Sequence, residues 1–349
     1  MIIFIIVSNF LTKTKPMQEL QTTIQDLTLQ KPIIEVIKDF TDSFNAVKTQ
    51  NRYKIVLIEF FSVLNIIRLE ELWEIHITEI AKKFEVYKNK KSKFDSENKS
   101  HLLNPATINN IAYIIRSFFK YLITYYNYPK NPLANFKPLK TKEHSTTHSL
   151  DRNELLDILK QSKMDYLDIL YKSKNPRKHL TKLRNYLIFG FLSLSLRRDE
   201  IVNMKWDDLQ EDSFFLIRQK WGSYKYIPVP VWLLDFLLKY REDKTKNGFL
   251  SSYIFTPFLN NYSWNISKPL SADYIMEITQ KMCNRLNIDK KITPHSFRKT
   301  FIEISLNKNE NYNNIMNATG HKTSQMIRYY DYRDKVKNNA INSFWDIFY

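Results

Sequence analysis

The segment 293–332 reads TPHSFRKTFIEISLNKNENYNNIMNATGHKTSQMIRYYDY. Thr293 followed by Pro294 is typical of a helix start, because the first helical turn needs no N–H from the proline. In the helix predicted from this point, His295 and Arg298 are three residues apart and therefore share one face. The segment thus predicts a helix that presents an imidazole and a guanidinium to one ligand.

The same segment predicts a second helix that ends at Gly320, because glycine readily takes the left-handed conformation found after a helix C-terminus. His321 follows directly, and a short polar turn leads from it to Tyr329 and Tyr330. Groups that can bind anions and one or two phenols are therefore concentrated in this part of the chain.

Upstream, residues 214–231 read FFLIRQKWGSYKYIPVPV, with β-favouring residues on both sides of Gly222. This pattern predicts a β-hairpin. Before it, Asp151 and Glu154 form a capping-box pair, and Leu150 with Leu155 can form the apolar staple of a helix start. A new domain is predicted to begin there.

Residues 138–147, which precede this predicted domain, are polar, basic and without periodicity, which is typical of a linker between domains. Farther upstream, Asn104 and Pro105 predict a helix start, and apolar residues then recur at helical spacing: Ile108, Ile111, Ile115, Phe118 and Leu122. We predict an N-terminal extension over 1–35, of which 1–16 precede a possible start at Met17, a helical domain over 36–137, a linker over 138–147, and a second domain over 148–349 that ends in a helix.

The composition indicates a folded protein with a polyanionic partner. The formal net charge is +17 and 43% of residues are hydrophobic, so a phosphate polymer is the first expectation, although a Lys- and Asn-rich coding bias is an alternative source of the charge. The single cysteine, Cys283, excludes an internal disulfide framework and fits a reducing cytoplasm. The apolar start lacks the features of a signal peptide and is too short to span a bilayer.

Taken in order, these motifs resemble those of the tyrosine recombinase family, which includes phage integrases and Xer-type resolvases. The matching blocks are SLRRDEIVNMKWDDL, QKWGSYKYIPV, PHSFRKTF and TGHKTSQMIRYY. The resemblance covers residues 148 to about 335 by motif, and 36–140 by helical pattern. It implies these catalytic residues: Arg197, Lys220, His295, Arg298, His321 and the nucleophile Tyr330, with Tyr329 as its rival.

The chemistry of a phosphodiester explains these residue types. Negative charge builds up on the non-bridging oxygens as the phosphorus is attacked, and two guanidiniums, Arg197 and Arg298, can neutralise it. A protein hydroxyl keeps the bond energy in a phosphotyrosyl ester. His295 would take its proton, Lys220 would protonate the departing 5′ oxygen, and His321 would bond a non-bridging oxygen.

The resemblance implies a mainly α fold with a small antiparallel sheet, in which a SAM-like helical core-binding domain and a catalytic domain close around DNA as a clamp. It implies site-specific recombination through a 3′-phosphotyrosyl intermediate, without metal or nucleotide cofactor. The expected partners are double-stranded DNA core sites and three further copies of the chain in a synaptic tetramer, with a monomer in solution. We expect a cytoplasmic, nucleoid-associated protein and no membrane partner.

Several points stay open from sequence. Ser195 stands where the family usually has glycine, Lys299 stands where histidine is common, and the doublet Tyr329-Tyr330 permits a slip of one residue. Glu200 has the simple explanation of a favourable charge in the first turn of a helix. The alternatives are a topoisomerase-like relaxing enzyme, a non-catalytic DNA-binding protein that retains the fold, and a basic cytosolic protein selected for something else.

Overall fold

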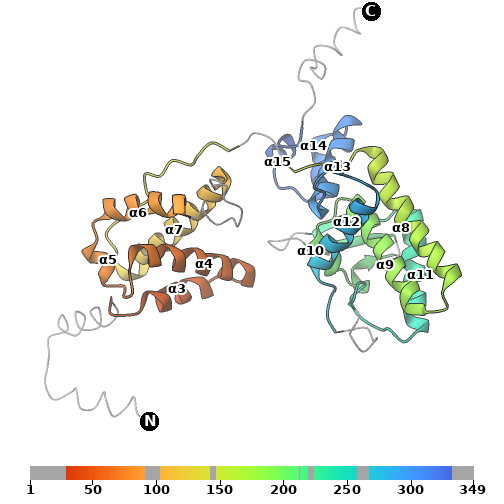
Figure 1. The fold of residues 1–349 in the computed structure, drawn as a ribbon, viewed down its shortest axis with the longest axis horizontal. Coiled ribbons are helices and arrows are strands. Elements are labelled where there is room, and N and C mark those ends of the chain that lie inside the picture. Colours follow the sequence, from red (N-terminus) through yellow and green to blue (C-terminus); the bar gives the residue numbers. More distant parts are fainter. Residues whose placement is uncertain are drawn as a thin grey trace, which may run out of the picture. The chain divides into compact units, whose positions relative to one another are not determined.

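The structure is a computed structural model and describes residues 29–90, 103–141, 147–211, 213–218, 224–257 and 267–331. The chain divides into two compact units, 1–142 and 143–349 (Figure 1). Each unit has a hydrophobic core of its own, formed by buried side chains that come from that unit alone. The two units are therefore described separately.

The regular elements of the first unit, within its described residues, are helices. Its elements are α3 (Ile33–Asp42), α4 (Val47–Leu64), α5 (Glu71–Glu74), α6 (Ile77–Lys90) and α7 (Pro105–Tyr126). Helix α7 confirms the sequence prediction. Asn104 caps it by accepting the N–H of Ala106 at 3.0 Å, Pro105 is its first residue, and the predicted apolar face is buried. Aromatic rings fill much of this core, with Phe118 at an edge-to-face distance of 5.3 Å from both Phe40 and Phe61.

The second unit combines helices with one small sheet. It contains α8 (Arg152–Lys172), α9 (Pro176–Ser193), α10 (Arg198–Val202), the 3₁₀ turn η2 (Trp206–Asp208), β1 (Leu209–Gln210), β2 (Phe214–Arg218), β3 (Tyr224–Pro228), α11 (Val231–Lys246), α12 (Ala272–Arg285), α13 (Pro294–Asn307), α14 (Tyr312–Thr319) and α15 (Ser324–Arg328). The sequence prediction of a mainly α fold with a small antiparallel sheet is confirmed.

The capping box predicted at Asp151 and Glu154 is present at the start of α8. Asp151 accepts the Glu154 N–H at 2.8 Å and Glu154 accepts the Asp151 N–H at 2.7 Å, which completes the capping box. Leu150 is buried and Leu155 packs against the same core. In addition, the Thr300 hydroxyl of α13 accepts the Leu150 N–H at 2.8 Å. The beginning of the unit is thus tied to the helix that carries the predicted site.

The predicted hairpin is present as β2 and β3, which pair antiparallel, and β1 extends the sheet on the other side of β2. Because side chains alternate across a strand, Tyr224 and Tyr226 face outward while Lys225 and Ile227 are buried. A lysine therefore occupies an inward position of this strand.

Helix α9 lies at the centre of the second unit, in contact with α8, α11 and α13. Its C-terminal half is buried on all sides, and it ends beside the residues of the predicted site. Within the described residues, no helix has both the length and the apolar character required to cross a lipid bilayer.

Candidate active site

Helix α13 carries two of the predicted site residues in its first turns. It begins at Pro294 with Thr293 as the N-cap, as predicted, and the Ser296 hydroxyl accepts the Thr293 N–H at 3.1 Å. The ring of Phe297 packs on that of Phe189 in α9, with centroids 6.1 Å apart. The start of α13 is therefore fixed both by its cap and by the core.

Arg298 is 2% exposed and is held mainly by backbone carbonyls. Its Nη1 donates to the Ser195 carbonyl at 2.9 Å, and its Nη2 donates to the Thr319 carbonyl and to Nε2 of His321, the latter at 3.3 Å. Burial and then the nearby Arg197 lower the pKa of Arg298 to about 10, so it remains charged at neutral pH. A guanidinium has five N–H donors, so these three bonds leave donors for an anion.

His321 is 8% exposed and both of its ring nitrogens have protein partners. Because Arg298 can only donate, Nε2 must accept, and the ring proton is on Nδ1, 2.8 Å from the Thr319 hydroxyl. That hydroxyl in turn donates to the Ile315 carbonyl at 2.6 Å. Desolvation and then the charges of Arg298 and Arg197 lower the pKa of His321 to about 3. The imidazole is therefore neutral.

The Tyr330 hydroxyl lies 3.1 Å from Nε2 of His295. Tyr330 is 7% exposed, whereas Tyr329 is 37% exposed, and the two rings meet edge to face with centroids 5.6 Å apart. Desolvation, followed by the charges of Arg298 and Arg197, lowers the pKa of His295 below its ordinary value. A neutral imidazole at this position can accept a proton from the phenol.

Arg197 is the N-cap residue of α10 and contacts Glu200. The Glu200 carboxylate accepts the Arg197 backbone N–H at 2.9 Å and its Nη1 at 2.7 Å. The same carboxylate accepts Nζ of Lys225 at 2.8 Å. Burial acts to raise the pKa of Glu200, but Lys225 and Arg197 outweigh it and the pKa is lowered. Glu200 is therefore an ionised link between two cations.

The structure thus brings together five of the six predicted catalytic residues. Hydrogen bonds join His295 to Tyr330 and Arg298 to His321, and the rings of His321 and Tyr330 lie with their centroids 6.1 Å apart. Arg197 is close enough to lower the pKa of both histidines. The sixth, Lys220, lies outside the described residues. The five residues that lie together also suit attack on a phosphate, in which negative charge builds up on the phosphate oxygens, because two cations and a phenol share one site.

Sequence reasoning missed the role of Glu200 and did not consider Lys225. Glu200 does lie in the first turn of α10, as expected, but it also binds both Arg197 and Lys225. The alternation of β3 could have identified Lys225, because it places residue 225 on the same side as the buried Ile227. A buried charge is paired or hydrogen-bonded, so an inward lysine indicates an acceptor close by.

Ser195 occupies a backbone conformation that favours glycine. Its φ is +69°, it is completely buried, and it directly follows the end of α9. Gly320, with φ of +70°, closes α14 as predicted. The carbonyl of Ser195 is the acceptor for Arg298, so the left-handed turn aims a backbone oxygen at the site. This conformation explains why glycine suits position 195.

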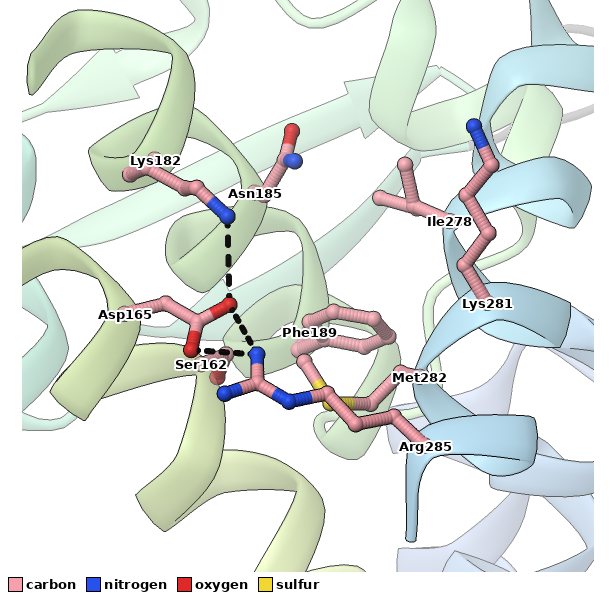
Figure 2. A pocket seen from close by; sticks show the side chains of 9 residues that line it. All are labelled: Ser162, Asp165, Lys182, Asn185, Phe189, Ile278, Lys281, Met282 and Arg285. Atoms are coloured by element: carbon pink, nitrogen blue, oxygen red, sulfur yellow. Dashed lines mark hydrogen bonds and ion pairs between the residues drawn. The ribbon is translucent and has the colours of Figure 1, made fainter. Parts of the chain in front are cut away.

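One cavity of the second unit borders the predicted site, and another does not. One, of about 290 Å³, is lined by His321, Thr323, Gln325, Met326, Tyr329 and Tyr330. It opens beside the phenol of Tyr330. The other, of about 180 Å³, lies among α8, α9 and α12 and contains none of the predicted catalytic residues (Figure 2).

In the second cavity, the Asp165 carboxylate binds Arg285 at 2.6 and 2.8 Å and Lys182 at 3.2 Å (Figure 2). Burial acts to raise the pKa of Asp165, but hydrogen bonds from Gln161, Arg285 and Lys182 outweigh it and the pKa is lowered. These contacts link α8, α9 and α12. The role of Asp165 is therefore to hold these helices together.

Comparison with known proteins identifies the family of this chain. The family model described as "Phage integrase family" matches residues 148–336, which is more than half of the chain. This chain therefore belongs to the phage integrase family and is a tyrosine-type site-specific recombinase.

Individual relatives are distant. The chain is 24% identical over 228 residues to tyrosine recombinase XerC of Pediococcus pentosaceus, which covers 64% of this chain and 70% of the relative. It is 24% identical over 286 residues to a tyrosine recombinase of Pseudothermotoga lettingae, covering 81% and 86%.

Solved structures share the fold at low identity. XerH site-specific recombinase bound to difH substrate is 18% identical, with a TM-score of 0.62 and coverage of 86% of this chain and 80% of that one. A lambda integrase dimer bound to a COC′ core site is 17% identical, with a TM-score of 0.58 and coverage of 94% and 83%.

Proposed function

We propose that this recombinase cleaves and rejoins double-stranded DNA with Tyr330 as the nucleophile. The observation that carries the proposal is the distance of 3.1 Å between the Tyr330 hydroxyl and Nε2 of His295, beside Arg298. Tyr330 Oη attacks the scissile phosphorus, a bond forms between them, and the bond to the 5′ oxygen breaks. A 3′-phosphotyrosyl ester and a free 5′ hydroxyl result, and attack by a second 5′ hydroxyl reverses the steps.

His295 is the proposed acceptor of the phenolic proton. The ordinary pKa of tyrosine, near 10, keeps the phenol protonated at neutral pH, so attack needs a base within reach. The lowered pKa of His295 keeps its ring neutral and able to accept. Arg298 and Arg197 are the proposed clamp for the non-bridging oxygens, because forked guanidiniums match paired oxygens.

Lys220 is the proposed donor of the proton that the departing 5′ oxygen requires. For His321, the contacts favour a supporting role over the direct one expected from sequence. Its Nε2 accepts from Arg298, so it can give a hydrogen bond to a phosphate oxygen only after that contact breaks and Nε2 gains a proton. We therefore assign His321 first to the orientation of Arg298.

The proposed partners follow from the family and from the titles of the solved relatives. XerH and lambda integrase were crystallised on DNA, the latter as a dimer on a core site. We propose that two protomers of this chain, monomeric in solution, close as clamps on each core site of nucleoid DNA in the cytoplasm, and that two such sites form a tetrameric synapse. Contacts to phosphates would dominate, as the net charge of +17 suggests.

The segment 336–349, which lies outside the described residues, is proposed to contact the neighbouring protomer. Its sequence, VKNNAINSFWDIFY, has the apolar content of a docking helix. Deleting it should impair synapsis and recombination more than binding to a single site. Synapsis at the wild-type level would refute this assignment.

A covalent-adduct assay tests the assignment of the nucleophile. A duplex with a nicked core site, taken from the genomic junctions that flank the gene, is incubated with protein in EDTA and run on a denaturing gel. We expect an adduct with wild type and with Tyr329→Phe, and none with Tyr330→Phe. Loss of the adduct in Tyr329→Phe alone would transfer the role to Tyr329. No adduct in any variant would favour the non-catalytic alternative.

A further inference from the structure

Lys225 is a buried cation that the mechanism above does not use. Its side chain is 2% exposed, and Nζ lies 2.8 Å from Oε2 of Glu200, whose side chain is 10% exposed. The register of the hairpin pairs Lys225 with Ile217, which is also buried. An apolar side chain would fit the alternation of β3 at this position.

Stability alone is a weak explanation for such a pair. Removing two charges from water costs free energy that their attraction often fails to recover, and apolar side chains of similar volume are commonly as stable. The presence of a lysine at this position therefore suggests a role for its charge. The contacts of Glu200 indicate which role.

The carboxylate of Glu200 divides its bonds between two cations. Oε1 accepts Nη1 of Arg197 at 2.7 Å, while Oε2 accepts the Arg197 backbone N–H at 2.9 Å and Nζ of Lys225 at 2.8 Å. Arg197 remains 41% exposed and holds Glu200 through a single guanidinium nitrogen. Its other donors can then face an anion.

We propose that Lys225 is a positioning residue for Arg197. Because Lys225 binds Oε2, Glu200 cannot turn both of its oxygens onto the guanidinium of Arg197. Without Lys225 the two side chains would form a bidentate pair, which is the geometry that arginine and carboxylate favour. Arg197 is thereby left with donors for the scissile phosphate. This inference rests on the proposed function, since it assigns Arg197 to that phosphate.

The charge of Lys225 should depend on pH within the working range. Burial lowers its pKa to about 8; Glu200 opposes this shift, while Arg298 and Arg197 add to it. Among the described residues, the titratable and charged groups facing it are Glu200 and Arg197 at α10, Arg298 on α13 and His321 after α14. Lys225 is therefore charged at neutral pH and loses its charge as the pH rises through about 8.

Arginine at position 225 would keep its charge as the pH rises through about 8, because the ordinary pKa of arginine is well above that of lysine. The ratio of the Lys225→Arg rate to the wild-type rate should thus rise with pH. Other groups that titrate, such as His295, are present in both proteins and cancel in the ratio. A purely structural role for Lys225 gives no reason for the ratio to change.

The experiment measures single-turnover adduct formation on the nicked duplex, with the full-length chain, from about pH 6.5 to about pH 9.5. Lys225→Met should be slower by ~10-fold or more at neutral pH, with DNA affinity within about twofold of wild type because Arg197 is one phosphate contact among many. Lys225→Arg should restore most of the rate, and its ratio to wild type should increase through about pH 8.

A Lys225→Met rate within about twofold of wild type, or a flat Lys225→Arg ratio, would overturn the proposal. If Lys225→Met is unfolded by circular dichroism, the pH dependence of the Lys225→Arg ratio decides alone. If wild type gives no adduct, the proposed function fails and this inference fails with it.

Discussion

The two arginines of the site are held in different ways. Arg298 is buried and donates to the backbone carbonyls of Ser195 and Thr319. Arg197 is partly exposed and is held by the carboxylate of Glu200, which Lys225 shares. One side of the site is therefore built from backbone dipoles, and the other from ionised side chains.

Because of this difference, the two sides should respond differently to pH and to substitution. Carbonyl dipoles do not titrate and His321 is neutral well above its pKa of about 3, so the position of Arg298 should be insensitive to pH near neutrality. The loss of Arg298 should also damage the fold. The ion pair between Arg197 and Glu200 is partly exposed and such a pair contributes little to the stability of the fold, so the position of Arg197 should be adjustable.

The largest effect is expected from Arg298→Ala. Cleavage should slow by ~10²- to 10³-fold, since a preorganised donor to the transition state is lost. The free energy of unfolding should fall by ~2–4 kcal/mol, because the buried carbonyls of Ser195 and Thr319 lose their donor. Single-turnover cleavage and urea unfolding measure the two quantities.

Arg197→Ala is the matched control. Its cleavage rate should fall by a comparable factor, yet its free energy of unfolding should stay within ~1 kcal/mol of wild type, because its ion pair is partly exposed and Glu200 keeps Lys225 as a partner. Equal losses of stability in both variants would remove the contrast between the two sides.

Local patterns predicted the residues on the backbone-held side. His295 and Arg298 belong to one helix whose start is encoded by Thr293 and Pro294, and Gly320 marks the end of another. The α7 face and the capping box of α8 are equally local. In each case the residues that decide the structure lie within a few positions of one another.

The ionic side could not be predicted in the same way. The pairing of Glu200 with Lys225 joins residues 25 positions apart in the chain and depends on how β3 packs beside α10. Likewise, the two-residue strand β1 exists through its pairing with β2, with Leu209 opposite Phe215. The sequence 209–210 is too short to show a period of its own.

His321 should make stability depend on pH on the backbone-held side. Its pKa is about 3 in the folded chain and near 6.5 when unfolded, so the unfolded state binds more protons between these values. The stabilising contribution is therefore fully present above about pH 6.5 and is lost as the pH falls toward 3, by up to ~1.4 kcal/mol per pH unit. Urea unfolding at several pH values measures the slope.

His321→Gln provides the comparison, because a glutamine oxygen can accept from Arg298 but does not titrate. Its free energy of unfolding should decline less steeply below about pH 6.5 than that of wild type. Parallel curves would mean that His321 is protonated at its ordinary pH in the folded chain, against the tautomer assigned from its contacts.

The smallest effect is expected from Ser195→Gly. A left-handed conformation costs a residue with a side chain about 1–2 kcal/mol, and glycine avoids this cost. The greater backbone freedom of glycine in the unfolded chain reduces the resulting gain in stability by about 0.5–1 kcal/mol. The lost bond from Ser195 Oγ to the Ala318 carbonyl is long, at 3.3 Å. Stability should therefore rise by ~0.5–1 kcal/mol, measured by urea unfolding.

Gly320→Ser reverses this change at nearly the same φ and should destabilise by a similar amount. The cleavage rate of Ser195→Gly should remain within about twofold of wild type, because the carbonyl that orients Arg298 belongs to the backbone and survives the substitution. A large loss of rate with intact stability would mean that the Ser195 side chain, rather than its backbone, holds the arginine. The contrast between a backbone-held and a charge-held arginine would then no longer describe the site.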